Sequence, residues 1–406
     1  MCPFEDQLFR ALQAAGMTEI PEQFSVVPRH QEIPQSVLTQ IGEFIQNFDQ
    51  ITTRFRWQET VTANAPAIAH NKRPEVCFFS AWDFHLPPNY LSDWQLIEFN
   101  DNGSGLLFAG LINRIFYDLS RLNQRQDLHP PMDFATLMEL IARLVEAEAR
   151  CFFGEVPQGL FLILDDTESL HRGKFRQELV LLCNHWQQRG WQVAIASPPE
   201  IQWQGQLMWQ GQEVRLIVNR STDFFWQAEE FMPLRTAYLE GTVYVAPNPF
   251  TYATRSDKRL LEFLSLPDWD EILGIQPQER LLMSAHVPET YLIQANNVDA
   301  IAQRKAEFFF KPLYGFAGRG VLTSDQVGRS RLHRFLKHGE HYVAQKRAAK
   351  SSIPIGDGDQ CSVLWTDLRV WAYRGEIFSI SGRASCHPDR LDLSPPAGWL
   401  PTYALA

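Results

Sequence analysis

Three oxygen-bearing side chains are spaced so that a pair of strands could bring them together. Glu98 and Asn100 lie two residues apart in an apolar, β-rich run, so both side chains leave the same face. Asp83 lies in an earlier run of the same kind, and a turn centred near Tyr90 would place it opposite Glu98. Carboxylate and amide oxygens are ligands that Mg²⁺ takes, so the patch predicts a metal site. The alternative is the polar face of a half-buried hairpin.

A lysine at the end of an apolar strand precedes a glycine-rich loop. Lys311 follows Phe308-Phe-Phe, and Gly315, Gly318 and Gly320 come soon after it. Glycines let backbone N–H groups approach a phosphate closely, and the ammonium adds a positive charge. The loop has neither the GK[ST] ending of a P-loop nor the spacing of the dinucleotide fingerprint. It predicts an anion-binding loop of another kind, with a flexible hairpin turn as the alternative.

Other charged or polar side chains lie on strand faces, near a helix start or at strand ends. Arg369 and Arg383 lie on two strands near the end of the sequence. Their guanidinium groups could clamp phosphate or carboxylate oxygens, or pair with carboxylates of the protein itself. Lys258 lies near the start of a helix, where a solvated lysine is the usual alternative. Three further residues lie at the ends of buried strands, where α/β units place ligand groups: Asp165, Asn219 and Arg220.

Hydrophobic periodicity assigns the elements that must position these residues. Residues 1–150 are predicted to form amphipathic helices and the hairpin with the candidate metal ligands. Residues 151–250 contain short apolar strands, with a helix between the first two, which is typical of a Rossmann-like parallel unit. Residues 251–406 contain the lysine strand, the glycine loop and a hairpin that carries both arginines. The fold class is therefore α/β, with more than one sheet.

Composition excludes several classes of protein. Hydrophobic residues make up 45% of the 406 residues and charged residues 21%, so a large core is available. The net charge of −10 argues against general binding to nucleic acids or anionic membranes. The apolar runs are too short for a membrane span, and the first residues do not resemble a signal peptide. The 6 dispersed cysteines fit neither a zinc site nor a disulfide framework, so we expect a cytoplasmic protein.

Taken together, the motifs resemble those of the ATP-grasp superfamily. Five of them occur in the order that this family presents: Lys258, Lys311 with its glycine loop, Tyr342–Lys346, Asp367-Leu-Arg369 and Arg383. The aspartate and the E-x-N metal pair, which come last in the family, occur near the beginning of this sequence instead. The resemblance implies a circularly permuted ATP-grasp fold with a Rossmann-like pre-ATP-grasp domain. The segment order and the Asp83–Glu98 spacing are also similar to glutathionylspermidine synthetases and eukaryotic glutathione synthetases.

The resemblance also implies an activity and roles for the residues. The family joins a carboxylate to an amine or thiol through an acylphosphate and releases ADP. ATP would be held by Lys258, Lys311, Gly315, Gly318, Gly320 and Gln345. Mg²⁺ would be held by Asp83, Glu98 and Asn100. The acylphosphate would be stabilised by Arg383, with Arg369 behind it. A substrate would lie near Asp165, Asn219 and Arg220.

Two departures from the family leave other functions open. The segment 313–320 has no acidic residue in its glycine loop, and Gln345-Lys346-Arg347 offers no acid for a ribose. One alternative is a non-catalytic nucleotide-binding or scaffold protein with a degenerate cleft. Another is phosphoryl transfer to a small acceptor without ligation. The expected partners are a small-molecule carboxylate and an amine. We expect no binding to nucleic acid or to a membrane. Whether the protein forms a homodimer is left open.

Overall fold

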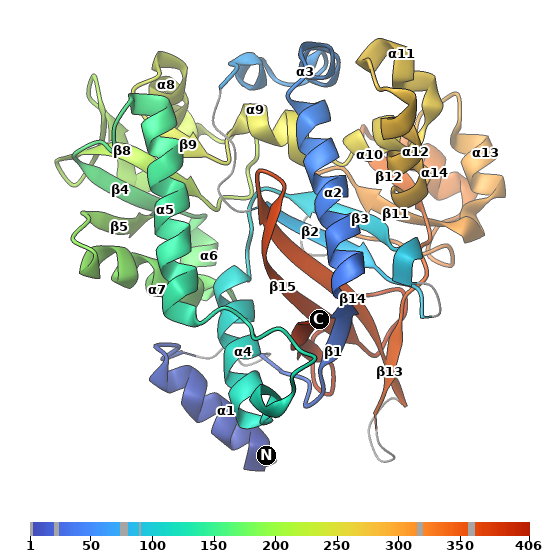
Figure 1. Ribbon diagram of the computed structural model, residues 1–406. Helices are drawn as coiled ribbons and strands as arrows, with labels where there is room; N and C mark the ends of the chain where they lie inside the picture. Colours follow the sequence, from blue (N-terminus) through green and yellow to red (C-terminus); the bar gives the residue numbers. More distant parts are fainter. Residues whose placement is uncertain (1–2, 20–23, 74–79, 89–90, 315–319, 356–361) are drawn as a thin grey trace.

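The computed structural model describes residues 3–19, 24–73, 80–88, 91–314, 320–355 and 362–406. Three groups of elements lie side by side across the molecule (Figure 1). In that view a parallel α/β unit lies on the left, an antiparallel sheet crossed by one long helix lies in the middle, and a small sheet with its helices lies on the right. The expected mixed α/β architecture with several sheets is present.

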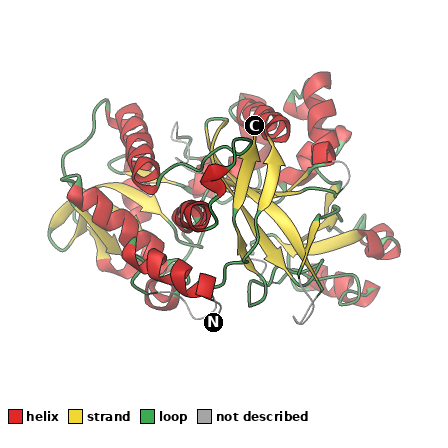
Figure 2. Cartoon of the chain, turned by 60° about the horizontal axis from the view of Figure 1, so that its bottom comes forward, coloured by secondary structure: helices red, strands yellow, loops and turns green. Residues whose placement is uncertain are grey.

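The central sheet joins two segments that lie far apart in the sequence. Its order is β16-β15-β14-β2-β3, and β13 also pairs with β14. The strands are β2 (Ser80–His85), β3 (Gln95–Asn100), β13 (Ser352–Pro354), β14 (Val363–Tyr373), β15 (Glu376–Ser385) and β16 (Gly398–Leu400). Because β2 pairs with both β3 and β14, the predicted N-terminal hairpin lies in one sheet with the predicted C-terminal hairpin. Figure 2 shows these strands with helices on either side.

The two faces of the central sheet differ because side chains alternate along each strand. Trp82, Phe84, Leu368 and Val370 pack in one buried cluster with the apolar side chains of α2 (Gln35–Thr52). The residues that alternate with them include two aspartates and two arginines, and these leave the opposite face. Helices that include α2 therefore cover the apolar face, and the charged side chains gather on the other.

The parallel unit contains the strands that the sequence predicted between residues 159 and 246. They are β4 (Leu160–Leu164), β5 (Val193–Ala196), β8 (Gln212–Asn219) and β9 (Tyr244–Ala246), all paired in parallel. β6 (Ile201–Trp203) and β7 (Leu207–Trp209) form a hairpin before β8. The helices that pack with these strands are α5 (Phe134–Phe153), α7 (Arg176–Gln188) and α8 (Met232–Glu240). α6 (Thr167–Arg172) follows β4 directly.

The small sheet carries the predicted lysine strand. It has the antiparallel order β10-β12-β11, with β10 (Thr290–Leu292), β11 (Phe308–Pro312) and β12 (Tyr342–Lys346). α13 (Val298–Gln303) and α14 (Arg329–Lys337) pack against it. After β9 the chain forms α9 (Pro249–Thr251), a π-helix (Tyr252–Ser256), α10 (Leu260–Ser265), α11 (Asp270–Leu273) and α12 (Pro277–His286).

The remaining elements include one pairing that the sequence did not predict. β1 (Gln31–Pro34) and β17 (Thr402–Leu405) form a parallel two-stranded sheet. The other helices are α1 (Pro3–Ala14), α3 (Phe55–Thr62) and α4 (Leu106–Leu119). Cys386 is disulfide-bonded, whereas the dispersed cysteines had indicated free thiols. Within the described ranges, every helix is either too short or too polar to cross a lipid bilayer.

Candidate functional site

Two arginines and two aspartates form a linked cluster on the charged face of the central sheet. Asp83 lies opposite Arg369 in the β2–β14 pairing, and Asp367 lies opposite Arg383 in the β14–β15 pairing. Arg369 donates to both oxygens of Asp83, with Nε–Oδ1 and Nη2–Oδ2 distances of 2.6 Å. Arg383 reaches both acids, with Nη2 at 3.0 Å from Asp83 Oδ2 and 2.6 Å from Asp367 Oδ2. The sheet register thus fixes two guanidinium groups side by side.

The side chains of this cluster are buried, so each charged group is stabilised by the opposite charges beside it rather than by water. Asp83 is 5% exposed and Arg383 is 9% exposed. Burial alone would raise the pKa of Asp83, but the charges of Arg369 and Arg383 hold this pKa well below its ordinary value. In the described part of the chain, Nη1 of Arg383 has no hydrogen-bond partner, since the contacts of this side chain use Nε and Nη2. The two aspartates therefore orient the guanidinium group of Arg383 and leave its Nη1 without a hydrogen bond in the described part of the chain.

Glu98 lies opposite Asp83, as the sequence predicted, and pairs with the predicted lysine. The β2–β3 register places Glu98 across from Asp83. Nζ of Lys258 lies 3.4 Å from Glu98 Oε1, and the side chain of Glu98 is 27% exposed. Lys258 lies just before α10, near a helix start as predicted, but it carries an ion pair in the site.

The three predicted metal ligands fit a hard cation unequally. Both oxygens of Asp83 already accept hydrogen bonds from guanidinium groups. Glu98 is partly exposed, and Asn100 Oδ1 accepts a single N–H, from Gly103 at 3.2 Å, so both have lone pairs available. Among the residues that the structure describes, no three Asp, Glu, His or Cys side chains converge on a metal position. Glu98 and Asn100 are therefore the pair that fits Mg²⁺, with other oxygens supplied from outside the chain.

Lys311 connects the small sheet to the central sheet. Its Nζ donates to the carbonyl oxygen of Ile97 at 3.0 Å and to Gln345 Oε1 at 2.6 Å. Both partners are neutral, so no carboxylate cancels its charge directly. Burial lowers the pKa of Lys311 to about 8, against the opposing effect of Glu98. Gln345, predicted to face adenine, is 1% exposed and serves here to hold the lysine.

Only part of the predicted glycine loop lies within the described residues. Gly315 and Gly318 lie outside them. Gly320 is exposed, with a φ of +75°, in the left-handed region that favours glycine. The role predicted for this loop stays a prediction.

The three residues predicted near a substrate lie at strand ends, as expected, but have internal partners. Arg220 is 4% exposed and its Nη2 lies 2.9 Å from Glu178 Oε2. Asn219 donates to the carbonyl oxygen of Pro247 at 3.1 Å. Asp165 is 9% exposed, and burial raises its pKa to about 7. These contacts hold the loops at this edge of the parallel sheet, and a substrate role stays a prediction.

Two further basic side chains belong to the same face, although sequence reasoning did not select them. His85 lies two residues after Asp83 on β2, and its Nδ1 lies 3.3 Å from the carbonyl oxygen of Ala348. Burial, together with the charges of Lys350 and Lys311, lowers the pKa of His85 well below its ordinary value. The period of two along β2 could have indicated His85. A single lysine in a loop, such as Lys350, gives no comparable signal.

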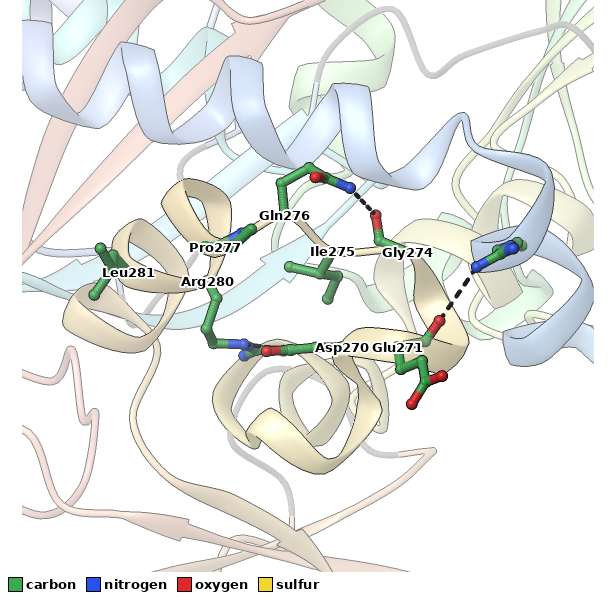
Figure 3. Close-up of a pocket in the computed structure, with 9 residues that line it drawn as sticks. Asp270, Glu271, Gly274, Ile275, Gln276, Pro277, Arg280 and Leu281 are labelled. Carbon is green, nitrogen blue, oxygen red and sulfur yellow. Dashed lines mark hydrogen bonds and ion pairs between the residues drawn. The ribbon is translucent and has the colours of Figure 1, made fainter.

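A separate pocket lies away from these residues (Figure 3). It is lined by α11, α12 and the loop between them, with Arg56 of α3 at its edge. Its polar groups contact one another: Arg280 Nε lies 2.6 Å from Asp270 Oδ1, and Arg56 donates to the carbonyl oxygen of Glu271 at 3.3 Å. These contacts hold the helices together, so we do not include the pocket in the candidate site.

Comparison with solved structures relates this geometry to known proteins. A glutathione synthetase-like effector from Globodera pallida, in its apo form, matches 100% of this chain and 98% of its own, with a TM-score of 0.61 at 9% identity. A gamma-glutamylcysteine synthetase-like protein from Methylobacillus flagellatus KT covers 87% of this chain and 83% of its own, with a TM-score of 0.48 at 10% identity. The ATP-grasp ligase PsnB covers 61% and 90%, with a TM-score of 0.29 at 11% identity.

Sequence comparisons add nothing to these structural ones. No protein-family model matches the chain, and no curated protein matches it. The likeness to the effector extends over both chains almost completely, and at 9% identity it concerns the fold. The chain therefore shares its overall fold with this glutathione synthetase-like effector.

Proposed function

We propose that this protein is an ATP-dependent, ADP-forming ligase that activates a carboxylate as an acylphosphate and joins it to an amine or a thiol. The observation that carries the proposal is the charge of one face of the molecule. This charged face comprises Lys258, Lys311, Lys350, Arg369, Arg383, Asp83, Glu98 and Asp367. Its five cations and three acids leave two positive charges in excess, in a protein whose net charge is −10. Such a face favours a polyanion.

The proposed roles follow from which cations are already neutralised. Lys311 has only neutral oxygens as hydrogen-bond partners among the described residues, so it is suited to bind a phosphate of ATP. Lys258 would bind a second phosphate, in exchange for its 3.4 Å contact with Glu98. Arg383, held by Asp83 and Asp367, would direct its remaining nitrogen at the oxygens of the acyl group.

The reaction proceeds in two displacements. A carboxylate oxygen of the substrate attacks the terminal phosphorus of ATP; a new P–O bond forms, and ADP leaves with the electron pair of the broken bond. The nitrogen or sulfur of the second substrate then attacks the acyl carbon, and inorganic phosphate leaves with the electron pair of the C–O bond. The attacking group loses its proton. The fixed guanidinium groups stabilise the charge on the oxygens in both steps.

Glu98 and Asn100 would hold Mg²⁺, which supplies charge neutralisation for the phosphates when it is bound. Asp83 would act on the arginines rather than on the metal, because both its oxygens are occupied by guanidinium groups. We also propose the circular permutation, which is supported by the pairing of the N-terminal strand β2 with the C-terminal strand β14.

Calorimetric titration with a non-hydrolysable ATP analogue, with and without Mg²⁺, tests the nucleotide site. We expect Mg²⁺-dependent binding by the wild type. Lys311→Met should weaken it about 10- to 100-fold, because a hydrogen bond to a charged group contributes about 1.5–3 kcal/mol. Lys337→Met, on the exposed side of α14, is the matched control and should bind like the wild type. Failure of the wild type to bind under either condition would refute the proposal.

A further inference from the structure

Lys350 is a lysine of the charged face that lacks a direct ion pair among the described residues. It lies between β12 and β13 and is partly buried. Among the described residues it has neither a hydrogen bond nor an ion pair, whereas Arg369, Arg383 and Lys258 all contact carboxylates. Burial lowers its pKa, which reflects an ammonium with little water and no direct counter-ion. Partial burial of a charge that contacts no acid in the described part of the chain costs free energy, which a bound anion would offset.

The backbone around Lys350 is fixed from both sides. The carbonyl oxygen of Ala348 lies 3.3 Å from Nδ1 of His85 on β2. Ser351 Oγ donates to the carbonyl oxygen of Leu86 at 2.8 Å, and the Ser351 carbonyl oxygen accepts the N–H of Thr366 on β14 at 2.9 Å. The segment therefore lies across the ends of two central strands. The backbone on both sides of Lys350 is thus held against β2 and β14.

The electrostatic neighbours of Lys350 locate it beside the arginine–aspartate cluster. They are Asp367, Arg383, Asp389 and Asp83. The carboxylate of Asp389 is bound by Arg347 at 2.7 Å, and both aspartates of the cluster are bound by arginines. Each of these three acids therefore already has a cation as its partner. Lys311 and Lys350 are the two ammonium groups of the charged face that contact no carboxylate directly.

We propose that Lys350 is a further phosphate-binding residue, which contacts the terminal phosphoryl group of the triphosphate while that group passes to the carboxylate. This inference rests on the proposed function and deepens it. Lys311, bound to Gln345 of β12, would hold the nucleotide. Lys350, beside Arg383, would hold the transferred group where the acyl oxygens arrive. An ammonium that contacts no acid among the described residues is suited to this role, because binding a phosphate breaks no ion pair within the described part of the chain.

The test compares two nucleotides that differ in this phosphate. We would titrate ADP and a non-hydrolysable ATP analogue into the wild type, Lys350→Met, Lys350→Arg and the control Lys337→Met, all with Mg²⁺. Lys350→Met should weaken binding of the triphosphate about tenfold and change ADP binding less than twofold. Lys350→Arg should recover most of the triphosphate affinity. Lys350→Met should also melt at the wild-type temperature or above it, because it loses no hydrogen bond or ion pair of the described part of the chain and removes a partly buried charge.

The outcomes separate this inference from the function on which it rests. If the wild type binds both nucleotides and Lys350→Met binds the triphosphate equally well, the inference is wrong and the proposed function stands. If Lys350→Met weakens the binding of both nucleotides to the same degree, Lys350 does not contact the terminal phosphate specifically, and the inference is also wrong. If the wild type binds neither nucleotide, the proposed function fails and the inference fails with it.

Discussion

Asp83 is shared by two guanidinium groups, and this sharing defines the geometry of the site. The sequence identified Asp83 and both arginines as functional candidates, but it assigned the acid to a metal and the arginines to a substrate. The alternative, that strand arginines pair with carboxylates, describes their observed contacts. The pairing could not be derived from the sequence, because Asp83 and Arg369 are 286 positions apart.

Asp83→Asn should destabilise the protein strongly. The substitution leaves two buried guanidinium groups short of a counter-ion, and removal of one member of a buried ion pair costs about 3–5 kcal/mol. Urea unfolding at neutral pH measures this loss. Because the folded pKa of Asp83 is lowered, its stabilisation is complete above the ordinary carboxyl range and is lost as the pH falls through the folded pKa. Asp299→Asn removes an exposed ion pair with Arg329 and should change little. Equal effects of the two variants would contradict the assignment.

Lys311 should make nucleotide binding sensitive to alkaline pH. Its pKa of about 8 lies below the ordinary lysine value, so the ammonium is lost as the pH rises through 8, and with it the attraction for phosphate. For folding the sign is opposite: a depressed lysine pKa lets stability rise as the pH increases from about 8 toward the ordinary lysine value. ADP titrations between about pH 7 and 9.5 should show affinity falling in the wild type but not in Lys311→Arg. Parallel curves for the two proteins would show that Lys311 does not govern binding.

At the scale of elements, local signals predicted the strands and helices well, and distant pairings were not accessible. The turn between β2 and β3 is local, so counting residues from it correctly placed Asp83 opposite Glu98. The insertion of that hairpin beside β14 and the pairing of β1 with β17 depend on contacts across most of the chain. Composition and periodicity carry no information on such contacts. The same limit explains why Lys350 was missed, since its neighbours come from β2, β14, β15 and the segment after β15.

One contact between elements couples the parallel unit to the loop that follows β3. Glu178 of α7 is 1% exposed and accepts the N–H groups of Gly105 and Leu107 at the start of α4, at 3.0 and 2.8 Å. It also pairs with Arg220 at 2.9 Å. Glu178→Gln should therefore lower the free energy of unfolding by about 3 kcal/mol or more in urea titrations. Glu168→Gln, on the exposed side of α6, is the control. A loss no larger than that of the control would rule out this coupling.

At the scale of the molecule, the central sheet draws its strands from both ends of the chain. β2 and β3 come from the first quarter, and β14, β15 and β16 come from the last 44 residues (Figure 1). Neither part alone contains the whole sheet. The site requires both, since Asp83 and Glu98 come from one and the arginines from the other.

Fragments of residues 1–250 and 251–406 should therefore not form the central sheet independently. Each would expose the edge of an incomplete central sheet and the apolar residues that pack with α2. During heating followed by circular dichroism, neither fragment should reproduce the cooperative transition of the whole chain. A mixture that refolds together should regain it. A fragment that melts by itself as the whole chain does would contradict the shared core.

The measurement that tests the central claim most directly is the analysis of products formed from ATP and Mg²⁺ with pools of carboxylates and amines or thiols. We would quantify ADP enzymatically and identify products by mass spectrometry. We expect ADP, phosphate and a condensed product only when a carboxylate and a nucleophile are both present, and no turnover by Glu98→Gln. A stable phosphorylated acceptor without condensation would indicate phosphoryl transfer instead. Absence of ADP with every pool, from protein that binds the ATP analogue, would indicate a nucleotide-binding scaffold and contradict a ligase.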